Sequence, residues 1–274
     1  MGSRMAANLR RAGFDVVVWN RTPARAEELG PPIAATPAEA ASQAGLVITM
    51  VVDAPQVEAV LFGDDGAAAG AAPGTLVADM STIAPGASRE IAARLAERGI
   101  SFLDAPVTGS RPKAEDGTLT IMTGGHAADF ERARPAFEAM GSLVLHVGPQ
   151  GHGSMIKLIN NTVAAINAGA VAQAFVVARA AGVDPERLVD VMRAGSGASA
   201  MLDLKAGPML SGDFEPLFKL EHMLKDVRHC LAEAEALGPG FGLGQAAAEL
   251  YARAAGAGLG ERDFAAVIAA AETV

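Results

Sequence analysis

Two apolar runs, each followed within a few residues by a helix, decide the fold of this 274-residue chain. The first run is Leu46-Val47-Ile48-Thr49-Met50-Val51-Val52, and the second is Leu76-Val77-Ala78-Asp79-Met80. Strand signals at residues 101–103 and 118–123 continue the pattern, with helix signals between them. Alternation of this kind is typical of a parallel, doubly wound sheet. We therefore predict an α/β fold in which ligands bind at the carboxyl ends of the strands.

The second part of the chain carries helix signals only. An apolar, alanine-rich pattern runs from about Gly153 to about Ala181 without a proline, which is unusually long for a globular helix. After Pro185 we find only helix patterns and turns. We therefore expect a sheet domain at residues 1–150 and an all-α domain at residues 151–274, joined by the long helix.

Composition and charge exclude several classes of protein. The net charge of −9 makes nucleic acid an unfavourable partner. Cys230 is the single cysteine, which excludes an internal disulfide, and the five scattered histidines show no metal-ligand spacing. Polar residues or glycines interrupt the apolar stretches, so we expect neither a signal peptide nor a membrane span. These features predict a cytoplasmic protein without a bound metal.

The chain opens with a helix and not with a strand. Residues 1–9 have the pattern of a helix, and Val16-Val17-Val18-Trp19 follows as a buried strand. A dinucleotide-binding fold opens with a strand and the turn G-x-G-x-x-G, and only Gly2 stands where one of these glycines falls. Relative to that pattern we expect about ten residues, with the first strand, to be missing. This predicts weak cofactor binding and low solubility.

The tripeptide Asn20-Arg21-Thr22 follows the expected strand at residues 16–19. In an NAD-binding fold, an acidic residue here accepts hydrogen bonds from the ribose 2′-hydroxyl, and this chain has none at Asn20. An amide, a guanidinium and a hydroxyl suit a 2′-phosphate instead. The alternative is that Arg21 is a solvated loop residue. We predict that NADP(H) is the preferred cofactor and that NAD(H) is also accepted.

Two further stretches suit acid/base chemistry. Asp104-Ala105-Pro106-Val107-Thr108-Gly109-Ser110 ends a strand in a turn of small residues, whose N–H and hydroxyl groups suit a carboxylate. Gly151 and Gly153 precede a helix and are expected to let its first turn approach a ligand. Lys157 and Asn161 then lie four residues apart on one helical face. We predict that Lys157 is the general acid/base for a small carbonyl acid and that Asn161 orients the substrate or the lysine. The alternative for Lys157 is a surface lysine with a buried stem.

These two stretches resemble the signatures of the β-hydroxyacid dehydrogenase family, and the resemblance extends from Met1 to about Ala270. It implies a Rossmann-type domain, similar to that of 6-phosphogluconate dehydrogenase, followed by a helical domain. It also implies that the substrate carboxylate is held by Thr108, Gly109 and Ser110. The cofactor contacts that it implies are Met1, Gly2, Asn20, Arg21, Thr22, Met50, Val51, Val52, Val57, Thr82 and Lys225.

Some of these implied contacts have simpler alternatives. The apolar side chains are equally consistent with core packing, and Thr82 with a helix N-cap. Lys225 precedes Asp226 in a stretch, residues 218–226, that resembles a second family motif. Its alternative is an exposed helical lysine paired with an acid.

The resemblance is greatest to the glyoxylate/succinic semialdehyde reductases, through Asn20-Arg21-Thr22, Ser110 and residues 214–220. It predicts an NADPH-preferring reductase of a small aldehyde or keto acid, as a homodimer or homotetramer without membrane or nucleic-acid partners. One alternative is a dehydrogenase that oxidises 3-hydroxyisobutyrate or a related β-hydroxy acid. Another is an oligomeric binding scaffold with impaired catalysis. Lys157 argues against the scaffold, and against the related imine reductases, which usually lack this lysine.

Overall fold

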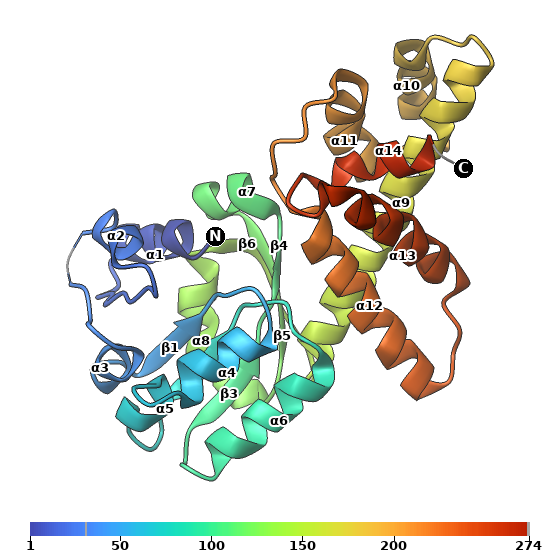
Figure 1. Cartoon of the computed structure of the whole chain (residues 1–274). Helices are drawn as coiled ribbons and strands as arrows, with labels where there is room; N and C mark the ends of the chain where they lie inside the picture. The colour runs from blue at the N-terminus through green and yellow to red at the C-terminus, as the bar shows by residue number, and fades with distance from the viewer. Residues whose placement is uncertain (31, 273–274) are drawn as a thin grey trace. The chain divides into compact units, whose positions relative to one another are not determined.

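The computed structural model describes residues 1–30 and 32–272. The chain divides into two compact units, Met1–Lys157 and Leu158–Val274 (Figure 1). Helix α9 (His152–Ala180) begins in the first unit and continues into the second.

The first unit is built on a six-stranded sheet in which β1, β2 and β3 are parallel neighbours. Strand β5 runs antiparallel to β3 and β4 and parallel to β6. The predicted α/β fold is confirmed, but the sheet is mixed and not wholly parallel. The connection from β4 to β5 is shorter than the dozen or so residues that a parallel crossover needs, so the chain reverses there. The strands are β1 (Leu46–Thr49), β2 (Leu76–Asp79), β3 (Ser101–Asp104), β4 (Val107–Thr108), β5 (Leu119–Gly124) and β6 (Gly141–Gly148).

Both faces of the sheet are covered, as the fully buried strand β2 shows. Val77 points into one hydrophobic cluster with α4 (Ala54–Phe62), α5 (Ala67–Gly70) and α6 (Pro85–Ala96). Leu76 and Ala78 point into the cluster on the opposite face, because successive strand residues alternate. That second cluster takes in α1 (Gly2–Arg11), α7 (Ser110–Asp116) and α8 (Ala127–Glu138).

Residues 16–19 do not form the buried strand that the sequence predicts. Val18 makes an isolated parallel bridge with Ile33, and only Val18 in this stretch is buried. A cavity of about 850 Å³ separates the stretch from β1, which is the terminal strand of the described sheet. The cavity is lined by apolar side chains that include Met5, Leu9, Leu46, Ile48 and Met140. Without a neighbour on this side, the stretch cannot build a ladder. Helices α2 (Pro23–Glu27) and α3 (Pro37–Ser42) follow it.

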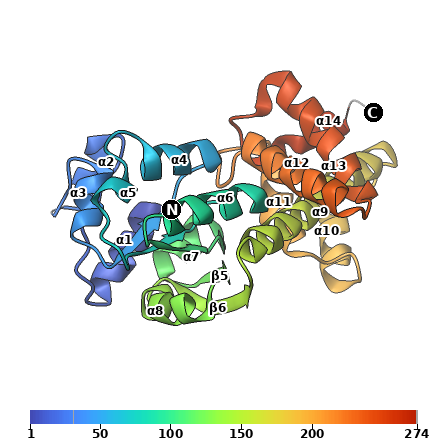
Figure 2. The same ribbon diagram turned by 90° about the horizontal axis from the view of Figure 1, so that it is seen from below.

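The regular elements of the second unit are all helices among its described residues (Figure 2). Its helices pack around α9, which contributes Ala165, Ala168, Val171, Ala172 and Phe175 to one hydrophobic core. By length and mean hydropathy (1.5), α9 is the one helix among the described residues that could cross a membrane. In this structure the apolar residues of α9 contribute to the hydrophobic core of the second unit. The other helices are α10 (Pro185–Ala194), α11 (Ala200–Ser211), α12 (Leu220–Leu237), α13 (Gly242–Ala254) and α14 (Val267–Ala271).

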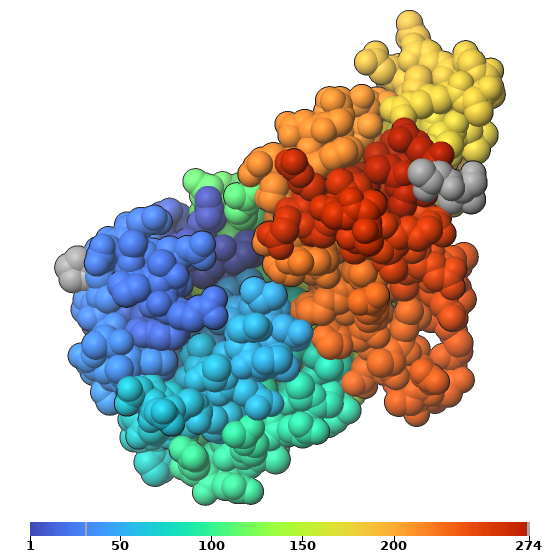
Figure 3. Space-filling view, in the orientation of Figure 1, coloured from blue at the N-terminus to red at the C-terminus, as the bar shows by residue number. Residues whose placement is uncertain are grey.

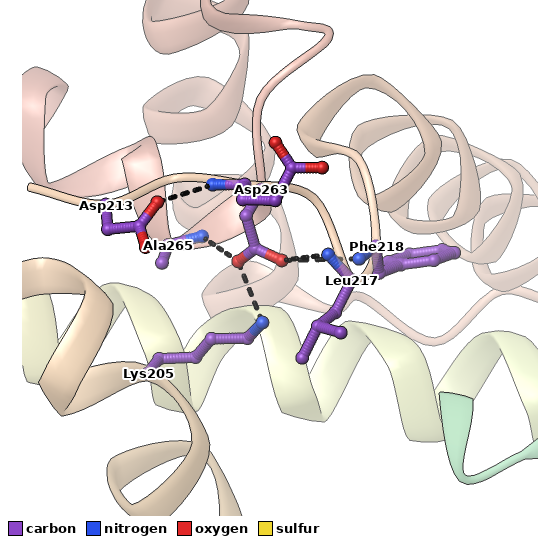
Figure 4. Close-up of polar contacts among 7 residues, drawn as sticks. Lys205, Asp213, Leu217, Phe218, Asp263 and Ala265 are labelled. Carbon is purple, nitrogen blue, oxygen red and sulfur yellow. Dashed lines mark hydrogen bonds and ion pairs between the residues drawn. The ribbon is translucent and has the colours of Figure 1, made fainter. Parts of the chain in front are cut away.

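A buried ion pair fixes the segment that leads into α12 (Figure 4). Lys205 on α11 donates to Asp263 Oδ1 at 2.8 Å, and the Ala265 N–H donates to the same oxygen at 2.9 Å. The N–H groups of Leu217 and Phe218 donate to Asp263 Oδ2 at 3.0 and 3.2 Å. Both ionic side chains are less than 5% exposed. The carboxylate therefore connects α11, the 217–218 segment and the start of the C-terminal helices.

Candidate active site

The turn after β4 has the backbone geometry of a constrained site. Thr108 is the last residue of β4, and Gly109 follows with φ of 131°, which glycine tolerates. Ser110 has φ of 59° and is the only non-glycine residue with positive φ among those described. Such a conformation costs of order 1–3 kcal/mol and is commonest at functional sites. Both positive φ values therefore fall within Thr108, Gly109 and Ser110, the three consecutive residues predicted to bind a carboxylate.

The start of α9 is fixed by a buried carboxylate, Asp104, for which the sequence pattern predicts no role. Asp104, at the end of β3, accepts hydrogen bonds from the Gly151 and Ser154 N–H groups, each at 2.7 Å. The Gln150 side chain donates to it at 2.8 Å. Burial raises the pKa of Asp104, although the hydrogen bonds from Gly151 and Ser154 oppose this. Asp104 caps α9 one turn before Lys157.

Gly153 is required by close packing against the sheet. A Cβ atom at this position would collide with the Met122 carbonyl oxygen and would lie 2.6 Å from the Asp104 carbonyl oxygen. The first turn of α9 therefore packs directly on the backbone of β3 and β5. Gly151 has φ of 91°, a conformation that favours glycine.

Lys157 and Asn161 lie four residues apart on α9, and both are largely buried, at 8% and 5% exposed. In the second unit, Asn161 Nδ2 donates to Asp226 Oδ2 at 2.7 Å. Lys225 Nζ lies 3.1 Å from Asp226 Oδ1. The structure thus unites Asn161 and Lys225 through Asp226. The helical spacing of Asp226 with the buried residues Met223, Val227 and Cys230 is the sequence signal that could have revealed this acid.

The carboxyl ends of β1 and β2 carry the next group of predicted residues. Met50 and Val51 are half-buried, and Val52 is 47% exposed in the turn after β1. Thr82 follows β2 by three residues and is half-buried. Val57 is fully buried in the core, which is the packing alternative for this residue. Four of these five positions therefore reach the surface at one edge of the sheet.

The N-terminus of α1 lies at the same edge, because a Cβ on Gly2 would contact Met50 Cβ at 3.6 Å. The first N–H groups of a helix have no intrahelical partners and favour an anion. Burial, and then the positive charges of Arg4 and Arg111, lower the pKa of the Met1 amino group. This surplus of positive charge at a helix N-terminus fits a pyrophosphate.

The loop after residues 16–19 is ordered by its own side chain. Asn20 Oδ1 accepts a hydrogen bond from the Thr22 N–H at 2.9 Å. Arg21 between them is exposed, and the segment belongs to the blue part of the surface in Figure 3. Of this loop, Asn20 lines the same cavity as Met1 and Gly2.

Two family models cover almost the whole chain. Residues 1–148 match the NAD binding domain of 6-phosphogluconate dehydrogenase. Residues 151–271 match the model described as NAD-binding of NADP-dependent 3-hydroxyisobutyrate dehydrogenase.

Individual relatives extend over nearly the same length. The chain is 38% identical to L-threonate dehydrogenase of Cupriavidus necator, over 98% of this chain and 92% of the relative. It is 35% identical to glyoxylate/succinic semialdehyde reductase 2 of Arabidopsis thaliana, over 98% and 76%. The crystal structure of 3-hydroxyisobutyrate dehydrogenase from Salmonella typhimurium is similar with a TM-score of 0.90 at 32% identity, covering 98% of this chain and 95% of that one. Fold, family models and relatives agree, and the chain belongs to the β-hydroxyacid dehydrogenase family of NAD(P)-dependent oxidoreductases that act on CH–OH groups.

Proposed function

We propose that this protein is an NADPH-preferring reductase that converts glyoxylate, succinic semialdehyde or a similar small carbonyl acid to the hydroxy acid. The observation that carries the proposal is the position of Lys157, one turn into a helix whose start is fixed by Asp104. A largely buried ammonium group at such a fixed point is suited to act on a developing negative charge.

The chemistry assigns one role to each group. When bound, a reduced nicotinamide would supply the hydride that the carbonyl carbon needs. Lys157 stabilises the negative charge that grows on the carbonyl oxygen and gives it a proton; in the oxidative direction the neutral amine removes that proton. Thr108, Gly109 and Ser110 hold the substrate carboxylate through hydroxyl and N–H groups. Asn161, whose amide is anchored on Asp226, orients the substrate or the lysine.

Arg21 is the proposed determinant of cofactor choice. Its exposed guanidinium, between Asn20 and Thr22, pairs with a 2′-phosphate, and Lys225 contacts the cofactor near the nicotinamide. Arg21→Ala should raise the KM for NADPH about ten- to a hundredfold, as expected for a lost charge-assisted contact, and should leave that for NADH nearly unchanged. A wild-type enzyme that prefers NADH would contradict this assignment.

A dehydrogenase that oxidises a β-hydroxy acid is the second candidate. It is favoured by the names of two relatives, L-threonate dehydrogenase and 3-hydroxyisobutyrate dehydrogenase. Initial rates in both directions, on a panel of short semialdehydes and hydroxy acids with NADPH and NADH, separate the two candidates.

We propose that the protein acts as a homodimer or homotetramer. Ile156, Ile159, Val163 and Val177 on α9 are 40–67% exposed. At 3.6 residues per turn they lie within an arc of roughly 60° on one side of the helix. An apolar stripe of this kind is typical of an interface between copies. Light scattering should give a mass of two or four chains, and a monomer would contradict it.

The decisive experiment replaces Lys157. Lys157→Met removes the charge and keeps an unbranched side chain, and should lower kcat about a hundred- to ten-thousandfold while NADPH binding persists. The matched control is Lys219→Met, at a half-buried lysine that pairs with Glu261, and it should keep wild-type kcat. A Lys157→Met enzyme that retains most of its kcat would remove this lysine from the mechanism.

A further inference from the structure

Three buried polar side chains meet where β1 and β2 end. Thr49 and Asp79 are the last residues of the two strands and pair with each other in the parallel register. Ser81 follows two residues after β2. All three are at most 4% exposed, although they lie beside the turn that carries Met50, Val51 and Val52.

Asp79 is the acceptor at the centre of this cluster. Its Oδ1 accepts the Thr49 hydroxyl at 2.6 Å and the Ser81 hydroxyl at 2.7 Å. The Ser81 N–H lies at 3.3 Å from the same oxygen. Because the Ser81 hydroxyl donates to Asp79, its oxygen lone pairs face away and accept the Val51 N–H at 2.9 Å. The chain of bonds therefore runs from β2 through Ser81 to the turn after β1.

Two buried hydroxyl groups can be satisfied by a neutral acceptor, and burying a carboxylate for this purpose is energetically unfavourable. Asp79 Oδ2 is buried and has no hydrogen-bond partner among the described residues. Burial raises the pKa of Asp79, which shows that the surroundings disfavour its charge. Buried polar atoms are normally paired, and an unpaired one lowers stability. The presence of a carboxylate here therefore calls for a role other than stability.

We propose that Asp79 and Ser81 are positioning residues, which hold the Val51 amide and so fix the 50–52 turn in the shape that binds the cofactor. The inference rests on the proposed function in one respect, that this turn contacts the cofactor. Asp79 reaches the turn through two neighbours, because its Oδ1 accepts bonds from Thr49, which directly precedes the turn, and from Ser81, which holds the Val51 amide. The acid orients the hydroxyl, and the hydroxyl orients the backbone.

The test compares three variants by titration with NADPH and with NADH, followed by nicotinamide fluorescence. Ser81→Ala removes the acceptor of the Val51 N–H and should raise the cofactor Kd about three- to tenfold. Asp79→Asn keeps the acceptor oxygen without the charge and should have a smaller effect in the same direction. The matched control is Ser88→Ala, which removes another fully buried serine hydroxyl. The Ser88 hydroxyl accepts a hydrogen bond from Gln150. This bond lies on the β3 side of β2, whereas the 50–52 turn follows β1 on the other side. Its Kd should stay within about twofold of wild type.

Hydrogen exchange supplies a readout that does not depend on the cofactor. The Val51 amide should exchange faster in Ser81→Ala than in the wild type, and at the wild-type rate in Ser88→Ala.

Two results would overturn the inference. One is a Ser81→Ala protein whose cofactor Kd equals that of Ser88→Ala. The other is a Val51 amide whose exchange is insensitive to Ser81. The cofactor Kd and the exchange of the Val51 amide are both measured without substrate. Failure to reduce glyoxylate or succinic semialdehyde would therefore contradict the proposed function, but it would not affect the interpretation of these two measurements.

Discussion

Asp79 gives the clearest dependence of stability on pH. Burial raises its pKa from 3.8 to about 6, against hydrogen bonds from Thr49 and Ser81 that lower it; the Asp104 charge raises it further. The folded state therefore prefers the protonated acid. Its contribution to the free energy of unfolding is fully present below pH 3.8 and is lost as the pH rises to about 6.

Asp79→Asn should remove this dependence. Relative to wild type, the variant should gain stability as the pH rises from about 4 to 7, by at most about 3 kcal/mol at 1.36 kcal/mol per pKa unit. Urea unfolding of both proteins across this range measures the difference, in which the titration of other carboxylates cancels. A difference that is flat with pH, or that favours the wild type at pH 7, would show that Asp79 is not held protonated by burial.

Residues within short sequence motifs could be proposed from the sequence, whereas residues whose partners are distant in the chain could not. Lys157 and Arg21 could be proposed from the sequence because each stands in a short motif beside a predicted element. Asp104 acts on Gly151 and Ser154, almost fifty residues away, and Asp226 acts on Asn161, at a greater separation still. Sequence spacing does not reveal which distant N–H groups a carboxylate will meet. Such partners become visible only when the strands and helices are placed.

The segment that leads into α12 depends on one buried ion pair, Lys205 with Asp263 (Figure 4). Asp263→Asn should leave the Lys205 ammonium buried without a counter-charge and cost about 3–5 kcal/mol. Lys205→Met should cost less, because the carboxylate keeps the N–H groups of Leu217, Phe218 and Ala265. The double variant should be more stable than Asp263→Asn alone, since it no longer buries the unpaired cation.

A double-mutant cycle of denaturant unfolding measures this coupling. The matched comparison is the exposed pair of Arg193 with Asp203, for which the same cycle should give about 0–1 kcal/mol. If the Lys205 and Asp263 effects simply add, the ion pair does not stabilise the segment in the way the hydrogen bonds indicate.

The strands and helices were predictable to different degrees. The apolar runs at residues 46–52 and 76–80 do contain β1 and β2, because buried parallel strands need continuous apolar sequence. The reversal at β5 was missed, since the direction of a strand depends on the length of its connection and not on its composition. Residues 16–19 have a strand sequence but no strand, because a ladder needs a neighbour and the cavity takes its place.

The cavity beside β1 is the largest departure of the first unit from a continuous sheet. In the bridge to residues 32–34, Val18 uses both its N–H and its carbonyl oxygen. In an extended chain the groups of Val17 and Trp19 therefore face the opposite side, towards the cavity. The far side of the cavity is the edge of β1, and the lining combines apolar side chains such as Met5 and Ile48 with charged ones such as Arg25 and Glu28. The unpaired edge of β1 can accept a further parallel strand.

A strand supplied to this cavity should stabilise the first unit and strengthen cofactor binding. The change is a fusion, ahead of Met1, of about ten residues: five or so apolar strand residues and a Gly-x-Gly-x turn. Each apolar side chain buried contributes about 1.5–3 kcal/mol, against about 1–2 kcal/mol per residue for ordering the backbone. With its ladder of hydrogen bonds, the strand should leave a net gain of roughly a few kcal/mol, which raises Tm by about 5 °C or more.

The matched control keeps Gly-x-Gly-x and replaces the apolar residues with serine and glycine, which cannot fill the cavity. NADPH affinity should rise only with the apolar fusion, because the turn and the N-terminus of α1 are then positioned together for the pyrophosphate. Equal Tm and affinity for the two fusions would show that the cavity does not accept a strand.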